Sequence, residues 1–314
     1  MLPARVFRSL FFCLCLAGTA NGQALDVSAR HGKSVAVQPL SKSEGEKVGA
    51  LFMAMCLTHF AQGHFEWAEE ACGQAIEADP RLADAYKVRG YAYLMNHRFE
   101  RAEKDFHAAL RLKPNDDQNV AGYADSLNGE GRFAEAAGQF RRALSLVPDR
   151  AAYWNGLCWA LAGEGSQLSV ALDSCNRALT LAPGAAGILN SRAMVYLRQR
   201  RFPLAVADYG ASLAVQRDQA SAWFGRGFAR LWLGEKQGSA DISEARRRDT
   251  GVDSIFVQMG VLPVHCAAAS VPACPPGFLP MPDKSSGAYQ VAVLHADPDQ
   301  ELVLEIKAGH LARR

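Results

Sequence analysis

Alanines and prolines recur along this chain at a nearly constant interval. Ala75, Ala109 and Ala143 are separated by 34 residues each, and Ala178 follows 35 residues later. Each alanine is followed five residues on by a proline, at positions 80, 114, 148 and 183. A repeat of this length is typical of stacked helical hairpins, in which each unit buries its apolar side against its neighbours.

The repeat unit is clearest in residues 82–114. Gly90 and Tyr93 share one face of a first predicted helix, and Ala102 and Phe106 share one face of a second, at a spacing of four residues. Such spacing is the periodicity of an α-helix. A small residue such as Gly90 lets the two helices approach, and a ring such as that of Phe106 fills the space beside it, so this apolar stripe predicts core packing.

This pattern resembles the tetratricopeptide repeat (TPR) family, whose units carry a large apolar residue, Gly and Tyr and then Ala, Phe, Ala and Pro. The match runs over about Gly49–Asp253 and is weaker in the first and last units. The resemblance implies an all-α, right-handed solenoid of about six helix hairpins. The apolar face of Asp253–Leu262 predicts a helix that caps the solenoid.

Residues 1–24 have the pattern of a secretory signal peptide. Arg5 and Arg8 precede a short apolar run, 10–17, and small residues follow at the cleavage positions, after Ala20 or Ala24. The run is shorter than the roughly 20 residues that a spanning helix needs. An uncleaved anchor is the alternative. We predict a signal peptide (1–24), a flexible lead-in (25–48), the solenoid with its cap (49–262) and a Pro-rich tail (263–314).

Net charge gives no reason to expect binding to nucleic acid or to an anionic membrane surface. The full chain carries +2, and removal of the predicted signal takes away two arginines and no acidic residue. A mature chain near neutrality lacks the basic surface that such partners attract. We expect a periplasmic or secreted protein with a protein or peptide partner.

Two cysteine pairs occupy equivalent places in two repeats. Cys56 and Cys158 stand where Gly90 stands in the second unit, and Cys72 and Cys175 stand where Phe106 stands. Those two places face each other across a hairpin, and an oxidising compartment favours disulfides. We predict Cys56–Cys72 and Cys158–Cys175 bonds; buried free cysteines are the alternative.

The C-terminal segment has a different character. Cys266 and Cys274 lie outside the repeats and by elimination should pair with each other, either as a structural closure or as a redox-active pair. Several prolines preclude a helix there. Tyr289–His295 and Glu301–Lys307 then predict two strands of a β-hairpin, because apolar and polar residues alternate in the second.

The TPR resemblance also implies that the first helices line a concave groove. Residues one place past the close-packing position, or four places before it, would face that groove. Amides and aromatic rings there suit an extended peptide, although packing between helices is the alternative for the rings. The predicted partner-binding residues are Lys87, Tyr91, Asp125, Asn155, Trp159, Asn190, Met194, Phe224 and Phe228, joined by Arg198 and Trp232 one turn further along their helices.

The sequence predicts no enzyme, no cofactor and no metal site. It lacks the Gly-x-Ser-x-Gly, His-Glu-x-x-His and phosphate-loop motifs. Some TPR proteins bind a carboxylate through a Lys/Asn/Arg clamp, but Tyr91 stands where the clamp asparagine would be.

We expect a non-enzymatic scaffold that binds a protein segment in its groove, in cell-envelope assembly or protein maturation. One alternative is a thiol-active protein that uses Cys266 and Cys274 on a bound partner. Another is a structural role in which the C-terminal hairpin adds to a partner's sheet.

Overall fold

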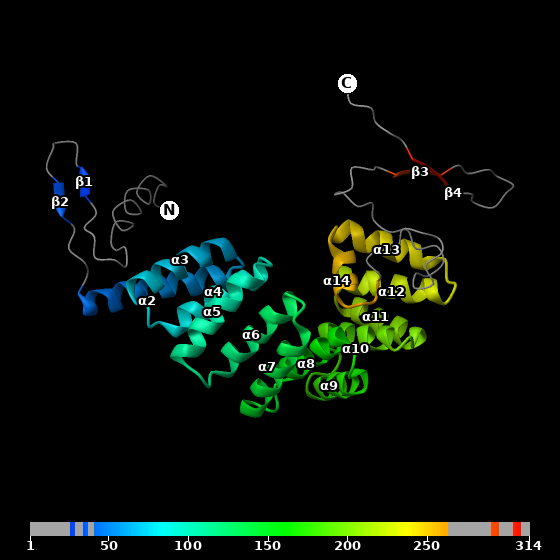
Figure 1. Ribbon diagram of the computed structural model, residues 1–314, viewed down its shortest axis with the longest axis horizontal. Helices are drawn as coiled ribbons and strands as arrows, with labels where there is room; N and C mark the ends of the chain where they lie inside the picture. The colour runs from blue at the N-terminus through cyan, green and yellow to red at the C-terminus, as the bar shows by residue number, and fades with distance from the viewer. Residues whose placement is uncertain (1–25, 29–33, 37–40, 263–289, 295–303, 309–314) are drawn as a thin grey trace, which may run out of the picture. The chain divides into compact units, whose positions relative to one another are not determined.

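The computed structural model describes residues 26–28, 34–36, 41–262, 290–294 and 304–308. Within these ranges the chain forms thirteen α-helices and two pairs of short antiparallel strands (Figure 1). The predicted signal peptide and the cysteines Cys266 and Cys274 lie outside the described residues, so what was predicted for them stays a prediction.

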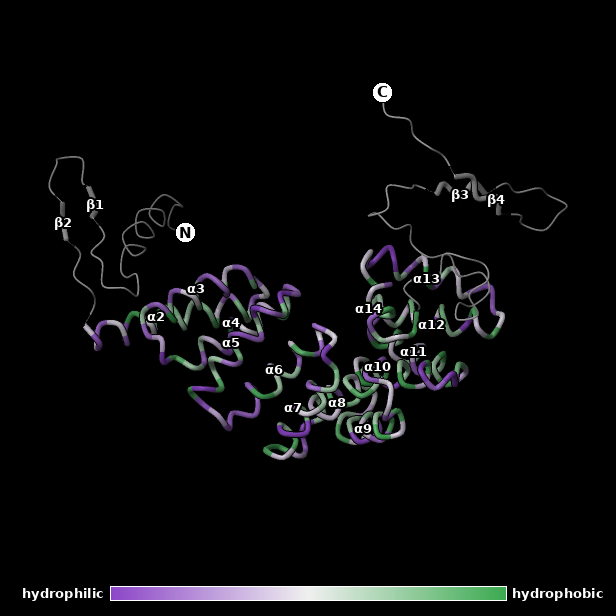
Figure 2. Tube along the Cα trace, viewed as in Figure 1, coloured by the Kyte–Doolittle hydropathy of each residue, from purple (hydrophilic) through white to green (hydrophobic). Residues whose placement is uncertain are grey.

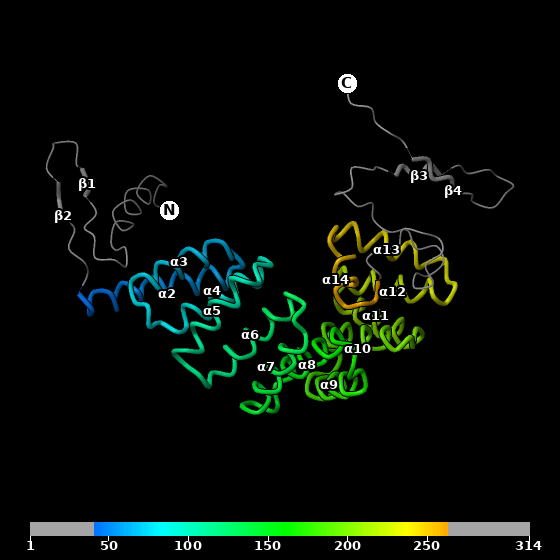
Figure 3. The backbone as a smooth tube through the Cα atoms, in the orientation of Figure 1, coloured from blue at the N-terminus to red at the C-terminus, as the bar shows by residue number. Residues whose placement is uncertain are grey.

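The helices follow one another as six hairpins and a final short helix, whose order can be traced in Figure 3. This confirms the predicted solenoid of about six repeat hairpins with a capping helix. In chain order the helices are α2 (Lys42–Ala61), α3 (Phe65–Ala78), α4 (Ala83–Met95), α5 (Phe99–Leu112), α6 (Asp117–Gly129), α7 (Phe133–Leu146), α8 (Ala151–Glu164), α9 (Leu168–Leu181), α10 (Ala186–Arg198), α11 (Phe202–Val215), α12 (Ala220–Trp232), α13 (Gln237–Arg248) and α14 (Val252–Gln258).

The first helix begins at Lys42 rather than near Gly49, where the repeat pattern places the start of the solenoid. A capping box explains the earlier start. The Ser41 hydroxyl accepts a hydrogen bond from the Glu44 backbone N–H, and the Glu44 carboxylate accepts one from the Ser41 backbone N–H at 2.9 Å. Both contacts satisfy donors that a helix start otherwise leaves unpaired.

Every hairpin turn contains one residue with a left-handed backbone. In four turns this residue is glycine, which adopts positive φ without strain. In the other two it is His97, with a φ of 55°, and Arg200, with a φ of 58°. A side chain at such a position costs about 1–2 kcal/mol, so these two turns are held by the packing around them.

A large ring fills the space between successive hairpins. Phe106 on α5 is fully buried, and a Cβ atom added at Gly90 would lie 3.0 Å from its ring. The predicted close contact is therefore present. An added Cβ at Gly122, in the next hairpin, would lie only 2.3 Å away. The tightest contact of this ring is thus with the following repeat rather than with its own.

Two kinds of link join the helices within hairpins. The Cα atoms of Cys56 and Cys72 lie 5.1 Å apart, and those of Cys158 and Cys175 lie 5.3 Å apart, within the range of a disulfide. In α4–α5, Arg89 instead donates two hydrogen bonds to Asp105, at 2.7 and 2.8 Å.

The described helices divide into two compact units. The N-terminal unit ends at Val195 and the C-terminal unit begins at Tyr196, so that α10 spans the boundary. Hydrophilic and hydrophobic residues intersperse along the helices (Figure 2). Among the described helices, none combines the length and the apolar character needed to cross a membrane.

Two strand pairs lie outside the helical repeats. In the predicted lead-in, β1 (Asp26–Ser28) pairs antiparallel with β2 (Ser34–Ala36). In the tail, β3 (Gln290–Leu294) pairs antiparallel with β4 (Leu304–Ala308), in a register that sets Ala292 opposite Ile306. The alternating pattern of the tail had predicted such a hairpin.

Candidate functional site

The first helices α4, α6 and α8 contact one another in succession within the N-terminal unit. We call the surface that these three helices share the first-helix face. Five of the predicted partner-binding residues belong to these helices. They are Lys87, Tyr91, Asp125, Asn155 and Trp159.

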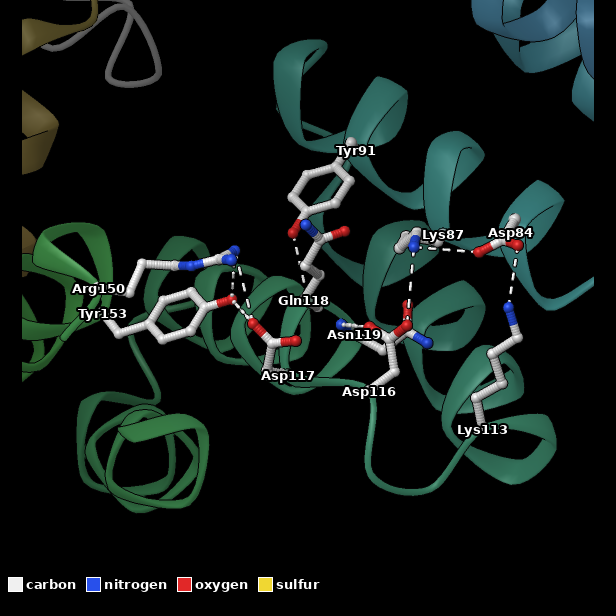
Figure 4. A network of polar contacts seen from close by, with 10 residues as sticks. All are labelled: Asp84, Lys87, Tyr91, Lys113, Asp116, Asp117, Gln118, Asn119, Arg150 and Tyr153. Atoms are coloured by element: carbon white, nitrogen blue, oxygen red, sulfur yellow. Dashed lines mark hydrogen bonds and ion pairs between the residues drawn. The ribbon is translucent and has the colours of Figure 1, made fainter. Parts of the chain in front are cut away.

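Lys87, the lysine of the first-helix face, forms ion pairs with two carboxylates of the chain. The Lys87 ammonium lies 3.0 Å from the Asp84 carboxylate and 3.7 Å from that of Asp116 (Figure 4). Lys113 donates a second hydrogen bond to Asp84, at 2.9 Å. Since Lys87 is neutralised inside the chain, it is a poor clamp for a ligand carboxylate.

Tyr91 belongs to a hydrogen-bonded link between repeats. Its hydroxyl donates to the backbone carbonyl of Gln118 at 3.0 Å, and its ring meets the Phe106 ring edge-on at 5.0 Å. Burial raises the pKa of the Tyr91 hydroxyl well above its usual range, so the phenol is neutral at physiological pH. The ring is therefore held in a fixed orientation on the first-helix face.

A second link of the same kind joins α6 to α8. The Tyr153 hydroxyl donates to the Asp117 carboxylate at 2.6 Å, and the Arg150 guanidinium lies 3.5 Å from the same carboxylate (Figure 4). The residues predicted from the sequence do not include this network. Its members lie at the starts of successive first helices, about one repeat apart. This spacing is the feature of the sequence that could have indicated the network.

Asp125 stands apart from these links. Its side chain is exposed, and no hydrogen bond or ion pair joins it to a residue that the structure describes. The protein crowded around it nevertheless raises the pKa of its carboxyl to about 7. Desolvation of the carboxyl, which disfavours its charged form, is the cause.

Asn155 and Trp159 on α8 are half-buried, so each keeps some surface for a ligand. The Asn155 side-chain oxygen has no hydrogen-bond donor among the described residues, and the same holds for Asn128 on α6. Both oxygens are themselves buried, so the exposed part of Asn155 does not include its acceptor oxygen.

Four of the predicted residues are buried in the structure and offer no surface to a ligand. Their exposed fractions are 6%, 1%, 0% and 2% for Asn190, Met194, Phe224 and Phe228 respectively. The Phe224 ring packs against Phe256 of α14, with 4.4 Å between centroids. Because Phe228 is also buried, its ring packs between helices, which was the alternative to partner binding.

The remaining two predicted residues belong to the C-terminal unit and are engaged within it. Arg198 donates a hydrogen bond to the backbone carbonyl of Met259, just after α14. Trp232 stacks on Phe202, with 5.6 Å between ring centroids, and the Arg200 guanidinium lies 5.0 Å from the Trp232 ring. These contacts leave the face of α12 largely occupied by the chain's own residues.

Among the described residues, no group of three or more His, Cys, Asp or Glu side chains could hold a metal ion.

The aromatic residues His59, His64 and Trp67 cluster at the first hairpin turn, where His59 and His64 lie 6.3 Å apart between ring centroids. The thiol-exchange hypothesis concerns Cys266 and Cys274, outside the described residues, and stays a prediction.

The family models that match this chain all describe the same repeat. Sequence models described as tetratricopeptide repeat match residues 83–116, 124–186 and 190–250, which together make up half of the chain. Tetratricopeptide repeat protein 6 of Homo sapiens is 24% identical over 182 residues, 57% of this chain. Protein FlbA of Caulobacter vibrioides is 29% identical over 185 residues, 59% of this chain. The chain aligns with only 35% and 31% of the lengths of these two curated relatives.

Solved structures share the fold at low sequence identity. The Cut9–Hcn1 hetero-tetramer of the APC/C has a TM-score of 0.58 at 12% identity, over 67% of this chain and 42% of that chain. PilW, described as a widely conserved type IV pilus biogenesis factor, has a TM-score of 0.55 at 18% identity, over 67% and 99%. The pilF protein of Pseudomonas aeruginosa has a TM-score of 0.51 at 16% identity, over 68% and 99%. At such identities the likeness concerns the fold alone.

Proposed function

The chain belongs to the tetratricopeptide repeat family, and from this premise we propose that it is a non-enzymatic scaffold that binds an extended segment of another protein. The binding surface is the first-helix face of the N-terminal unit. Repeat scaffolds of this family serve as protein-interaction surfaces, and their chemistry lies in the side chains that each chain presents.

The observation that carries this proposal is the contrast in exposure among equivalent residues. Trp159 and Asp125 keep exposed surface on the first-helix face, whereas the equivalent Met194 and Phe228 are buried. Aromatic rings with exposed surface are frequent anchors in protein interfaces.

We place the partner in the cell envelope. The signal-like segment at residues 1–24 and the two cysteine pairs support export to an oxidising compartment. The fold likeness to PilW and pilF makes envelope assembly a reasonable process to examine first.

The proposal is tested by affinity capture from the native envelope fraction, with residues 25–314 as bait. Trp159→Ala removes an anchor ring of the first-helix face. Trp67→Ala is the matched control, because Trp67 lies on α3 of the same unit and its side chain is 57% exposed. We expect one partner to be retained by the wild-type chain and by Trp67→Ala and to be lost with Trp159→Ala. A partner that all three baits retain equally would place the site elsewhere.

A further inference from the structure

The basic groups around the first-helix face already have acidic partners. Lys87 lies between Asp84 and Asp116, and Arg150 lies against Asp117 (Figure 4). Asp125 has no such partner among the described residues. The face therefore has a carboxylate to offer to a ligand, while its cations are already neutralised.

Aromatic residues stand on either side of this carboxylate. Tyr91, Asp125 and Trp159 are 34 residues apart and occupy the same place on α4, α6 and α8, which contact one another in that order. The negative charge of Asp125 contributes to the raised pKa of the Tyr91 hydroxyl. A carboxylate attracts a cation, and the faces of neighbouring rings add to the attraction.

The Asp125 carboxylate also sets which hydrogen-bonding groups a ligand needs there, since an ionised carboxylate accepts hydrogen bonds and donates none. Lysine and arginine side chains carry only hydrogen-bond donors, whereas carboxylate ligands carry only acceptors. The unpaired Asp125 carboxylate thus favours a basic ligand group. A nearby cation would also favour the charged form of the Asp125 carboxyl.

We propose that the first-helix face selects an extended peptide that carries a lysine or arginine side chain, with Asp125 as the counter-charge and Tyr91 and Trp159 on either side. This inference rests on the proposed function and names the chemistry of its ligand. An acidic peptide or a free C-terminal carboxylate is disfavoured, because Lys87, Lys113 and Arg150 are held by carboxylates.

The probe is an array of random nonapeptides whose central residue is fixed as arginine, lysine, citrulline, norleucine or glutamate. Labelled residues 25–314 are applied and the retained label is measured. We expect arginine and lysine peptides to retain roughly fivefold more protein than citrulline and norleucine peptides, as one partly solvated ion pair would give. Glutamate peptides should retain the least.

Asp125→Asn should abolish the preference for basic residues, so that arginine, lysine, citrulline and norleucine peptides retain similar amounts of protein. Asp173→Asn is the matched control, because Asp173 is an exposed acid on α9 of the same unit, and it should keep the preference. Equal retention by all five centres, or a preference that survives Asp125→Asn, overturns the inference. If Trp159→Ala still abolishes retention in that case, the proposed function stands. Retention of no peptide by the wild-type chain overturns both.

Discussion

The two units of this molecule use the same repeat in different ways. The N-terminal unit contains both described cysteine pairs, and its first-helix face keeps exposed surface around Asp125 and Trp159. In the C-terminal unit, α14 packs on α12, so that Phe256 covers Phe224 and the Met259 carbonyl receives Arg198. Helices α4, α6 and α8 of the N-terminal unit keep exposed surface on their shared face, whereas α12 of the C-terminal unit is largely buried.

The comparison shows that a position within the repeat does not by itself define a role. Trp159 and Phe228 occupy equivalent places, yet one is half-buried and the other is 2% exposed. What packs over each position decides whether it is surface or core. The five predictions below, from the largest expected effect to the smallest, test this contrast between the units.

The largest effect on stability is expected from the capping helix α14. Phe256→Ala removes a fully buried ring from α14 and should cost about 3–5 kcal/mol of local stability in the C-terminal unit, as large buried deletions do. Trp159→Ala should cost much less, because its ring is half-exposed. Hydrogen exchange of α12 and α14 measures the first effect, and equal protection loss in both variants would erase the contrast between the faces.

Among the residues that the structure describes, reduction should destabilise only the N-terminal unit. Each oxidised pair closes a loop with a sequence separation of 16 or 17 residues, which the chain-entropy account values at roughly 3 kcal/mol. Cys158→Ala combined with Cys175→Ala should lower the stability of α8–α9 by about this amount and leave α12–α13 unchanged. Alkylation of the native, unreduced protein provides the control. Labelling of Cys158 or Cys175 there would show that the bond does not form.

Close packing between hairpins should be equally sensitive in both units. Gly122→Ala places a Cβ 2.3 Å from Phe106, and Gly225→Ala places one 2.2 Å from Tyr209, so each should cost about 1–3 kcal/mol. Gly138→Ala, on α7, meets nothing within 4 Å and should instead stabilise the chain by up to about 1 kcal/mol. Urea denaturation of the three variants checks the opposite signs.

The two strained turns should respond unequally. His97→Gly relieves a side chain at positive φ and should stabilise the N-terminal unit by roughly 1 kcal/mol. Arg200→Gly, in the C-terminal unit, should gain less, because it also removes the guanidinium that lies over the Trp232 ring. Thermal melts distinguish the two, and a larger gain for Arg200→Gly would contradict the assigned role of that contact.

The smallest expected effect concerns pH. Since the folded pKa of Asp125 is about 7, above its unfolded value near 3.8, the folded chain binds the extra proton between these values. This group therefore lowers stability as pH rises from about 4 to 7. A full shift of this size would be worth about 4 kcal/mol. Because solvent screens an exposed side chain, Asp125→Asn should remove the dependence and stabilise the protein at pH 8 by much less, under about 1 kcal/mol.

The fold could be predicted because its information is local and periodic. The spacing of Ala102, Phe106 and Gly90 specifies two helices that pack closely, and the same spacing recurs one repeat later. The cysteine pairs followed from the same register. The start of α2 was missed although Ser41 and Glu44 form a visible capping box in the sequence.

The candidate site could be predicted only in part, because exposure depends on contacts beyond one repeat. Nothing near Phe224 in the sequence indicates that Phe256 will cover it. Likewise, nothing near Lys87 in the sequence indicates that Asp116, from the next repeat, lies beside its ammonium group. Such contacts depend on how far neighbouring hairpins rotate, which the repeat period leaves unspecified.

The cysteine pairs also have a mechanical consequence. Once oxidised, the first and fourth hairpins each hold a loop of 16 or 17 residues that tension cannot draw out, which withholds about 55–60 Å of contour length per loop. The hairpins α4–α5 and α6–α7 between them carry no such restraint. A stretched N-terminal unit would therefore yield first at its centre, where the Tyr91 and Asp117 links join neighbouring repeats.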